Sequence, residues 1–192
     1  MFTKISKPLY EKIAHYARFP QTGVSLSQMV KFGQKPSLGT LLKASQFVAE
    51  ELPVRLAHRV VELDNLPNNL NQMPSVQKVK HWYAESFEEI INFKKNIPSS
   101  IKGAFRSVGA TTVDASLQNL PLSKKNPDIP ASYRSSGSNS LHHRYYVNIP
   151  DGDLPPEVIE SNEAFVRLME GIKRRHDPVV TTLGIIASEV MN

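Results

Sequence analysis

Four segments of the chain place apolar residues three and four positions apart, which is the spacing of one helical face. The longest segment is residues 41–63, and its apolar stripe consists of Leu41, Ala44, Val48, Leu52, Leu56, Val60 and Leu63. Pro53 lies in the middle of this segment and removes one backbone donor, so a kink is expected just before it. The pattern predicts a half-buried helix around which the rest of the chain is organised.

The three other periodic segments predict one short helix and two longer ones. Leu9, Ile13, Tyr16 and Ala17 share one helical face before Pro20. A second long helix starts at Pro74, where proline is favoured in a first turn, and its stripe is Val76, Val79, Trp82 or Tyr83, Phe87, Ile90 and Phe93. The last stripe is Phe165, Met169, Ile172, His176, Val179, Leu183 and Ile186. Helices joined by short connections should pack antiparallel, so we expect an all-α, four-helix-bundle-like fold.

Residues 94–150 lack this periodicity and are rich in Ser, Pro, Asn, Gly and Lys. Such a segment buries too little apolar surface to offset the entropy of ordering it, so it is predicted to be a long disordered insertion. The chain therefore divides into residues 1–93, the first part of the bundle, residues 94–150, the insertion, and residues 151–192, the final helix. Pro178 should distort that final helix.

Composition narrows the possible functions. The chain has 192 residues, 40% of them hydrophobic, a formal net charge of +5 and no cysteine. Disulfides, thiolate catalysis and cysteine zinc sites are excluded, and no run of roughly 18 apolar residues predicts a membrane span. The basic residues are dispersed among acidic ones without interleaved aromatics, so no nucleic-acid partner is expected. His142 and His143 are adjacent and have no carboxylates nearby, so no metal site is predicted.

Two features allow both a structural and a functional interpretation. Residues 25–33 form an unusually apolar hook, in which Met29 and Phe32 either dock into the core or bind a partner. His176 lies within an apolar stripe, where a neutral histidine satisfied by a helix neighbour is the usual arrangement and a functional role is the alternative.

Three motifs in sequence order resemble the mitochondrial 2-oxoacid dehydrogenase kinases. Residues 51–59, ELPVRLAHR, resemble the ELPVR(L/I)A segment of that family. Residues 74–86, PSVQKVKHWYAES, resemble its PSVQxVxxWYxxS segment, and residues 174–177, RRHD, resemble its R-x-R-H-(N/D) segment. The resemblance covers residues 7–93 and 155–183. It identifies the chain as similar to the N-terminal regulatory domain of a protein-serine kinase of the mitochondrial matrix, most like the pyruvate branch, with the branched-chain branch as the alternative.

The resemblance implies a docking function. Kinases of this family phosphorylate and inactivate the pyruvate dehydrogenase complex, which regulates acetyl-CoA formation. Their bundle binds the lipoyl domain of the dihydrolipoyl acyltransferase, and the lipoyl arm enters an apolar pocket. The residues that match the lining of this pocket are Val24, Met29, Phe32 and Phe47. Under the resemblance, partner binding explains the apolar hook better than core packing does.

The resemblance also implies an inhibitory 2-oxoacid pocket within the bundle. The matching residues are Leu56, Tyr83, Ser86, Ile172 and His176. Tyr83, Ser86 and a protonated His176 would hold a small carboxylate. An arginine that the family commonly has near this histidine is Lys173 here, which grips a carboxylate less well.

The kinases of this family bind ATP and Mg in a C-terminal domain. No DxGxG or GxGxxG motif occurs in these 192 residues, nor does a conventional HRD or DFG set. We therefore expect the ATP-binding domain to be absent, the final helix to be truncated and the chain to be inactive in isolation, with His176 in a supporting role only. The alternatives are a non-catalytic fragment that binds lipoyl domains and a helical scaffold unrelated to the family.

Overall fold

The structure, a computed structural model, describes residues 5–21, 23, 26, 30, 38–96 and 155–185. The regular elements in these ranges are all helices, so the predicted all-α class is confirmed for this part of the chain. Their bounds are α1 Lys7–Tyr16, α3 Leu38–Asp64, a 3₁₀ turn η1 Leu70–Gln72, α4 Pro74–Asn96, α8 Pro156–His176 and α9 Val179–Gly184. Most of the predicted insertion, residues 97–150, lies outside the described residues.

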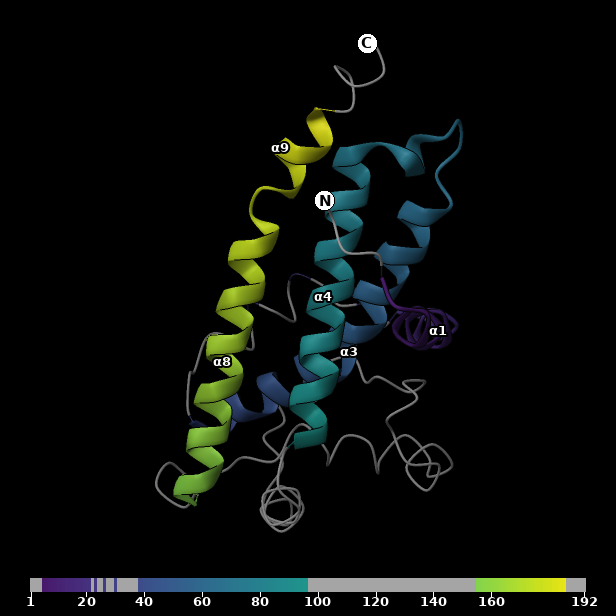
Figure 1. Cartoon of the computed structure of the whole chain (residues 1–192). Coiled ribbons are helices and arrows are strands. Elements are labelled where there is room, and N and C mark those ends of the chain that lie inside the picture. Colours follow the sequence, from purple (N-terminus) through teal and green to yellow (C-terminus); the bar gives the residue numbers. More distant parts are fainter. Residues whose placement is uncertain are drawn as a thin grey trace.

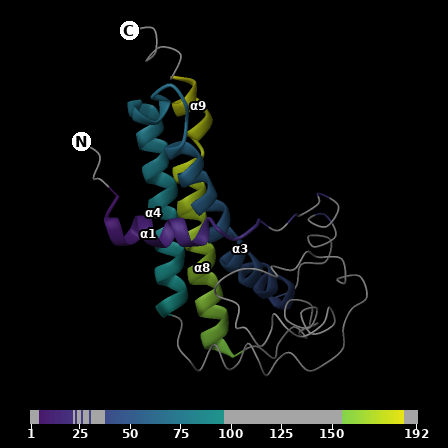
Figure 2. The same ribbon diagram turned by 90° about the vertical axis from the view of Figure 1, so that its right-hand side faces the viewer.

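The three long helices, α3, α4 and α8, pack on one another, and α1 crosses them. Figure 1 shows α4 between α3 and α8, with α1 viewed along its axis. After a quarter turn, α1 runs across α4 in Figure 2. A short connection through η1 joins α3 to α4, which accounts for the packing of these two helices side by side. The three long helices and the crossing helix α1 thus make up most of the described fold, and η1 and α9 are short additional elements.

Local sequence explains where several helices begin and end. Pro8 and Pro74 occupy first turns, where the missing backbone N–H would have no helical partner. Asn68 and Asn69 between α3 and η1 have φ angles of 55° and 60°, a left-handed conformation that asparagine tolerates. Pro178 separates α8 from α9, so the distortion predicted within one final helix is a break between two helices.

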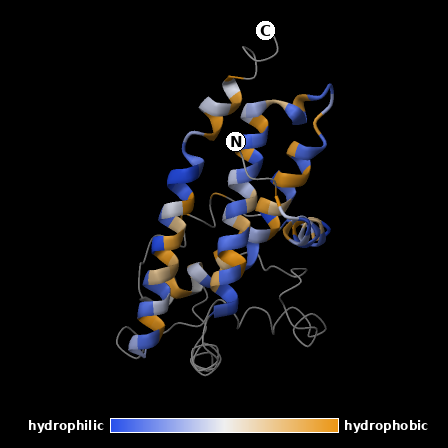
Figure 3. Ribbon diagram, viewed as in Figure 1, coloured by the Kyte–Doolittle hydropathy of each residue, from blue (hydrophilic) through white to orange (hydrophobic). Residues whose placement is uncertain are grey.

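The core lies where all four of the larger helices meet. Its buried residues are Ile13 and Tyr16 from α1; Val54, Leu56, Ala57 and Val60 from α3; Ala84, Phe87, Ile90 and Ile91 from α4; and Ile172 from α8. The rings of Tyr16 and Phe87 meet edge to face, with centroids 5.1 Å apart. Each helix carries both apolar and polar positions (Figure 3), as expected of amphipathic helices around a shared core.

The first turns of α3 depart from the predicted stripe. Leu56 and Val60 are buried as predicted, but Leu41 is 48% exposed and its neighbour Leu42 is buried instead. The reason is that this end of α3 lies beyond the core cluster and contacts α8, so a different side of the helix is covered. The predicted stripe is therefore wrong at Leu41.

Polar contacts hold the crossing helix in place. Asp64, at the end of α3, accepts hydrogen bonds of 2.8 Å from the Tyr10 hydroxyl of α1 and the Lys80 ammonium of α4. His58 Nε2 donates to the Phe19 carbonyl oxygen at 2.7 Å, just after α1. Three helices are thus joined at one carboxylate. Among the described residues, no helix is long and apolar enough to cross a membrane.

Candidate functional site

The structure brings together the residues predicted to form a 2-oxoacid pocket. Tyr83 and Ser86 lie three residues apart on α4 and share one face, which meets the last turn of α8 at His176. The Tyr83 and His176 rings contact edge to face, with centroids 4.8 Å apart. Leu56 and Ile172 are buried in the core cluster against which Tyr83 packs. The three polar side chains therefore lie beside the core cluster to which these two residues belong.

Ser86 is the centre of the polar group. Its side chain is 0% exposed, and its Oγ lies 3.0 Å from His176 Nε2. Arg175 donates a second hydrogen bond to the same oxygen, from Nη1 at 2.9 Å. The backbone carbonyl of Trp82 lies 3.5 Å from His176 Nε2. Ser86 therefore contacts two cationic or potentially cationic side chains from α8.

Arg175 also forms ionic contacts that join α8 to α4. Its guanidinium nitrogens donate to both carboxylate oxygens of Glu89, at 2.9 and 2.7 Å. Its Nε lies 3.4 Å from Glu85. Sequence reasoning did not single out Arg175 as a site residue, although the R-R-H-D motif that contains it was noted. A bidentate pair of this kind fixes the guanidinium in orientation as well as in position.

The environment favours neutral forms of both aromatic site residues. Burial lowers the pKa of His176, and the positive charge of Arg175 lowers it further, while the Trp82 carbonyl and Glu89 act in the opposite direction. Burial raises the pKa of Tyr83. On α3, the positive charge of Arg59 lowers this pKa and the negative charge of Glu62 raises it. The site thus presents hydroxyl groups and an imidazole with a reduced tendency to carry charge. Lys173, the position where the family commonly has arginine, is exposed.

The residues predicted to line a lipoyl pocket are only partly described. Phe47 is half-buried on α3. The other three, Val24, Met29 and Phe32, lie outside the described residues. Their arrangement around Phe47 therefore stays a prediction.

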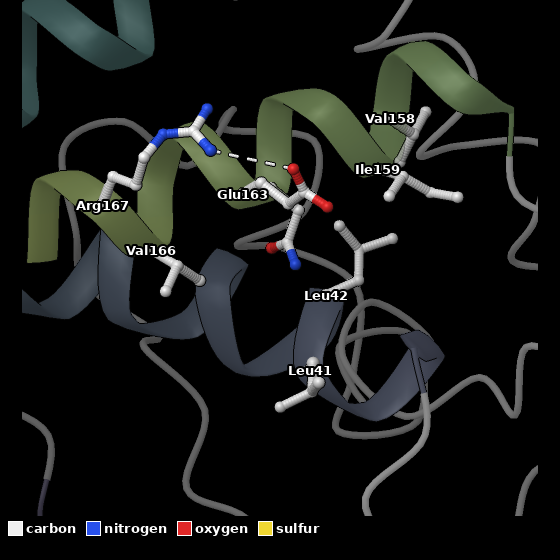
Figure 4. A pocket seen from close by; sticks show the side chains of 8 residues that line it. Leu41, Leu42, Val158, Ile159, Glu163, Val166 and Arg167 are labelled. Carbon is white, nitrogen blue, oxygen red and sulfur yellow. Dashed lines mark ion pairs between the residues drawn. The ribbon is translucent and has the colours of Figure 1, made fainter.

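A separate apolar cavity of about 290 Å³ lies between the start of α3 and the first half of α8. Its lining includes Leu41 and Leu42 of α3 and Val158, Ile159 and Val166 of α8. Figure 4 shows Leu42 reaching from α3 toward α8, near the Glu163–Arg167 ion pair of 3.7 Å. Asn162 also lines the cavity, and its buried Oδ1 has no hydrogen-bond partner among the residues that the structure describes. This cavity was not predicted, because the first turns of the final helix carried no motif.

No group of three or more His, Cys, Asp or Glu side chains that could hold a metal ion occurs in the described ranges.

The chain is similar to known proteins over most of its length. Residues 23–192 match the family described as mitochondrial branched-chain alpha-ketoacid dehydrogenase kinase. The chain is 32% identical over 189 residues to the pyruvate dehydrogenase (acetyl-transferring) kinase of Schizosaccharomyces pombe, a match that covers 96% of this chain and 44% of the relative. The corresponding kinase of Arabidopsis thaliana is 45% identical over 87 residues, covering 45% of this chain and 24% of the relative.

Human pyruvate dehydrogenase kinase isozyme 1 is 38% identical over 95 residues, covering 49% of this chain and 21% of the relative. The chain thus spans less than half of the length of these curated relatives. No solved structure gives a significant match.

Proposed function

Because this chain belongs to the mitochondrial 2-oxoacid dehydrogenase kinase family, and corresponds to its N-terminal regulatory domain, we propose that it has two roles in a protein-serine kinase of the mitochondrial matrix. It regulates the kinase, and it binds the lipoyl domain on which the kinase docks. The kinase would phosphorylate and inactivate the pyruvate dehydrogenase complex and so limit acetyl-CoA formation. The names of the matched relatives favour the pyruvate enzyme as substrate, and the name of the matched family keeps the branched-chain enzyme as the alternative.

The regulatory part of this proposal is a site for a small 2-oxoacid at Tyr83, Ser86 and His176. The observation that carries it is the convergence of these three side chains from α4 and α8 next to the core cluster that contains the buried Leu56 and Ile172. A small carboxylate requires hydrogen-bond donors, and its short carbon chain requires an apolar floor. The cluster supplies both.

Calorimetric titration of the 192-residue chain with pyruvate tests this site. Binding by the wild-type chain and its loss in His176→Gln are expected, while His15→Gln on α1 is the matched control and should bind as the wild type does. Titration with a branched-chain 2-oxoacid compares the two candidate branches. Unchanged pyruvate binding in His176→Gln, with helicity confirmed by circular dichroism, would place the ligand elsewhere.

The docking part of the proposal is capture of a lipoyl domain through its lipoyl arm. The arm is a thin aliphatic chain interrupted by one secondary amide. Support comes from Phe47 on α3 and from the cavity next to the start of the same helix. Leu42 and Val158 of this cavity are apolar, and its Asn162 Oδ1 receives no hydrogen bond within the described part of the chain. Burial of aliphatic surface yields about 25 cal/mol per Å², and the amide N–H of the arm would satisfy Asn162.

Calorimetry with a lipoylated domain, and with the same domain lacking lipoate, tests the docking proposal. Phe47→Ala should weaken binding of the lipoylated domain and leave the poor binding of the other unchanged. The exposed Val180 on α9 supplies the control Val180→Ala, which should bind as the wild type does. Equal losses for both forms of the domain in Phe47→Ala would speak against a lipoyl pocket.

The catalytic part of the family's activity requires ATP and Mg. We propose that these 192 residues contain no nucleotide site, since they lack a glycine-rich phosphate-binding motif. Measurable ATP hydrolysis or phosphate transfer by the purified chain would contradict this.

A further inference from the structure

The cavity between α3 and α8 is apolar and reachable from solvent. Among its lining residues, Leu42 and Val158 are buried, whereas Leu41 and Val166 are 48% and 44% exposed. An apolar cavity of about 150 Å³ can hold benzene, so the volume of about 290 Å³ here has room for a ligand of roughly ten non-hydrogen atoms. The cavity therefore suits a small molecule or one arm of a larger one.

Asn162 places one polar group in this apolar lining. Val158, Asn162 and Val166 follow one another at intervals of four residues on α8, so they form one row along the helix with a rise of about 6 Å between neighbours. An apolar side chain thus lies one turn away on each side of the Asn162 amide. Its Oδ1 is buried and accepts no hydrogen bond from any residue that the structure describes. A ligand that brings a donor would satisfy this oxygen.

We propose that the cavity recognises a secondary amide that joins two aliphatic segments, and that Asn162 determines this specificity by accepting a hydrogen bond from the amide N–H. One N–H matches one unsatisfied acceptor. The aliphatic segments on the two sides of the amide match the apolar residues on the two sides of Asn162. The inference rests on the proposed docking of the lipoyl arm for the identity of the natural ligand. It adds that the cavity selects the amide linkage and binds small amides without the rest of the lipoyl domain.

The charged residues of the lining favour a neutral ligand. These residues are Glu163 and Arg167, whose side chains are 62% and 65% exposed and pair with each other at 3.7 Å. Each charge is therefore compensated by the other and by water, and the described lining offers no unpaired charge to a carboxylate or an ammonium group. A neutral amide can donate its hydrogen bond without breaking this ion pair.

The proposed hydrogen bond requires a small movement of Asn162. Its Oδ1 is covered in the free chain, so the side-chain amide must turn to present the oxygen to the cavity. The terminal torsion of asparagine is broad, which makes this rotation accessible. The rotation leaves no broken contact behind, because Oδ1 has no donor within the described ranges.

Two small probes of the same shape test the selection of the amide. N-butylbutanamide and butyl butanoate differ only in the group next to the carbonyl, which is an N–H in the amide and an oxygen in the ester. Calorimetric titration of the wild-type chain should give an affinity about tenfold higher for the amide, the ratio that one net hydrogen bond supplies. Equal affinities, or no binding of either probe, would overturn the inference.

Asn162→Leu separates recognition from folding. The variant should bind the two probes equally, because the acceptor is gone, and should unfold at a higher temperature than the wild type, because a buried oxygen without a donor is removed. Glu160→Leu changes an exposed residue of α8 outside the lining, and this control should keep the preference for the amide. A preference retained in Asn162→Leu would refute the role of Asn162, whatever the stability of the variant.

Val166→Phe tests the position of the site. Because Val166 is partly exposed, a larger ring can be accommodated there without disturbing the core, and it should block entry of both probes. Circular dichroism checks that the variant remains helical. Unchanged binding of both probes in a helical Val166→Phe chain would place the ligand elsewhere and overturn the inference.

The lipoylated domain separates this inference from the docking proposal. Capture of that domain by the wild-type chain, undiminished in Asn162→Leu, would leave docking in place and overturn the role of Asn162. Selective binding of the amide probe by a chain that does not capture the lipoylated domain would support the inference and contradict docking.

Discussion

Ser86 and His176, 90 residues apart in the chain, meet through a 3.0 Å contact between Oγ and Nε2. This contact joins α4 to the last turn of α8 at a position where Ser86 has no solvent access. Because Arg175 donates to the same oxygen, one hydroxyl group connects the two helices twice.

Ser86→Ala should destabilise the chain by about 1–3 kcal/mol, because the substitution removes a buried partner from Arg175 and from His176. Urea denaturation followed by circular dichroism measures this difference. Ser161→Ala, a half-buried position on α8, serves as the control and should lie within about 0.5 kcal/mol of the wild type. A Ser86→Ala chain as stable as this control would show that the contacts of Ser86 contribute little to docking of α8.

Phe87→Ala should be the more severe change, at about 3–5 kcal/mol, because it leaves a cavity in the centre of the core and removes the edge-to-face contact with Tyr16. Phe93→Ala, further along α4, should cost less, since Phe93 is only partly buried and packs against Phe165. Thermal unfolding of both variants gives the comparison, and the reverse order would contradict the placement of the core.

Asp64 should make stability depend on acidity at low pH. Burial alone would raise its pKa, but hydrogen bonds from Lys80 and Tyr10 and the charge of Lys80 outweigh burial and lower it below its ordinary value of 3.8. A carboxyl whose pKa is lower in the folded chain stabilises the fold above its unfolded pKa, and this stabilisation is lost as pH falls through the folded pKa.

Asp64→Asn should therefore lose roughly 1 kcal/mol near neutral pH and little below the pKa of the folded carboxyl. Denaturant unfolding across the acid range measures the convergence of the two proteins. Glu62→Gln, which breaks only an exposed ion pair on the same helix, should show no comparable convergence. Parallel curves for wild type and Asp64→Asn would show that the carboxylate is not the source of the pH dependence.

His176 should give the free energy of unfolding a second dependence on pH, in a higher pH range. Its pKa in the folded chain is lowered, chiefly by burial, so the unfolded chain binds more protons between that value and about 6.5. Stability should thus fall as pH decreases through 6.5 toward the folded pKa, and the fall should be absent in His176→Gln. Unfolding free energies measured between about pH 5 and pH 7 provide the comparison. An equal fall in both proteins would assign it to another group.

Helical periodicity was sufficient to predict the class of fold and most of the core. Leu56, Phe87 and Ile172 fall on predicted stripes and are buried. Leu41 was predicted wrongly because periodicity reports one continuous face and does not show where a helix passes the end of the core. The break at Pro178 was foreseen only as a distortion, since a proline reports a missing donor but not the direction the chain takes afterwards.

The residues of the candidate site were recognisable by resemblance, but the hydrogen bonds and ion pairs among them were not. Tyr83, Ser86 and His176 matched family motifs, and the structure places them in contact. The role of Arg175 depends on which rotamer it takes and on Glu89 being one turn beyond Ser86, which are facts about two helices rather than one sequence segment. The Asn162 acceptor in the α3–α8 cavity was missed for the same reason.

The guanidinium of Arg175 lies between α4 and α8, where it donates hydrogen bonds to Glu89 and to the hydroxyl oxygen of Ser86. Free energies of events that share a group are reciprocal. Arg175 lowers the pKa of its neighbour His176, so the Arg175–Glu89 contact between the helices and the protonation of His176 should influence one another with equal coupling free energy. The packing of α8 on α4 and the proton occupancy of one imidazole are thus linked equilibria.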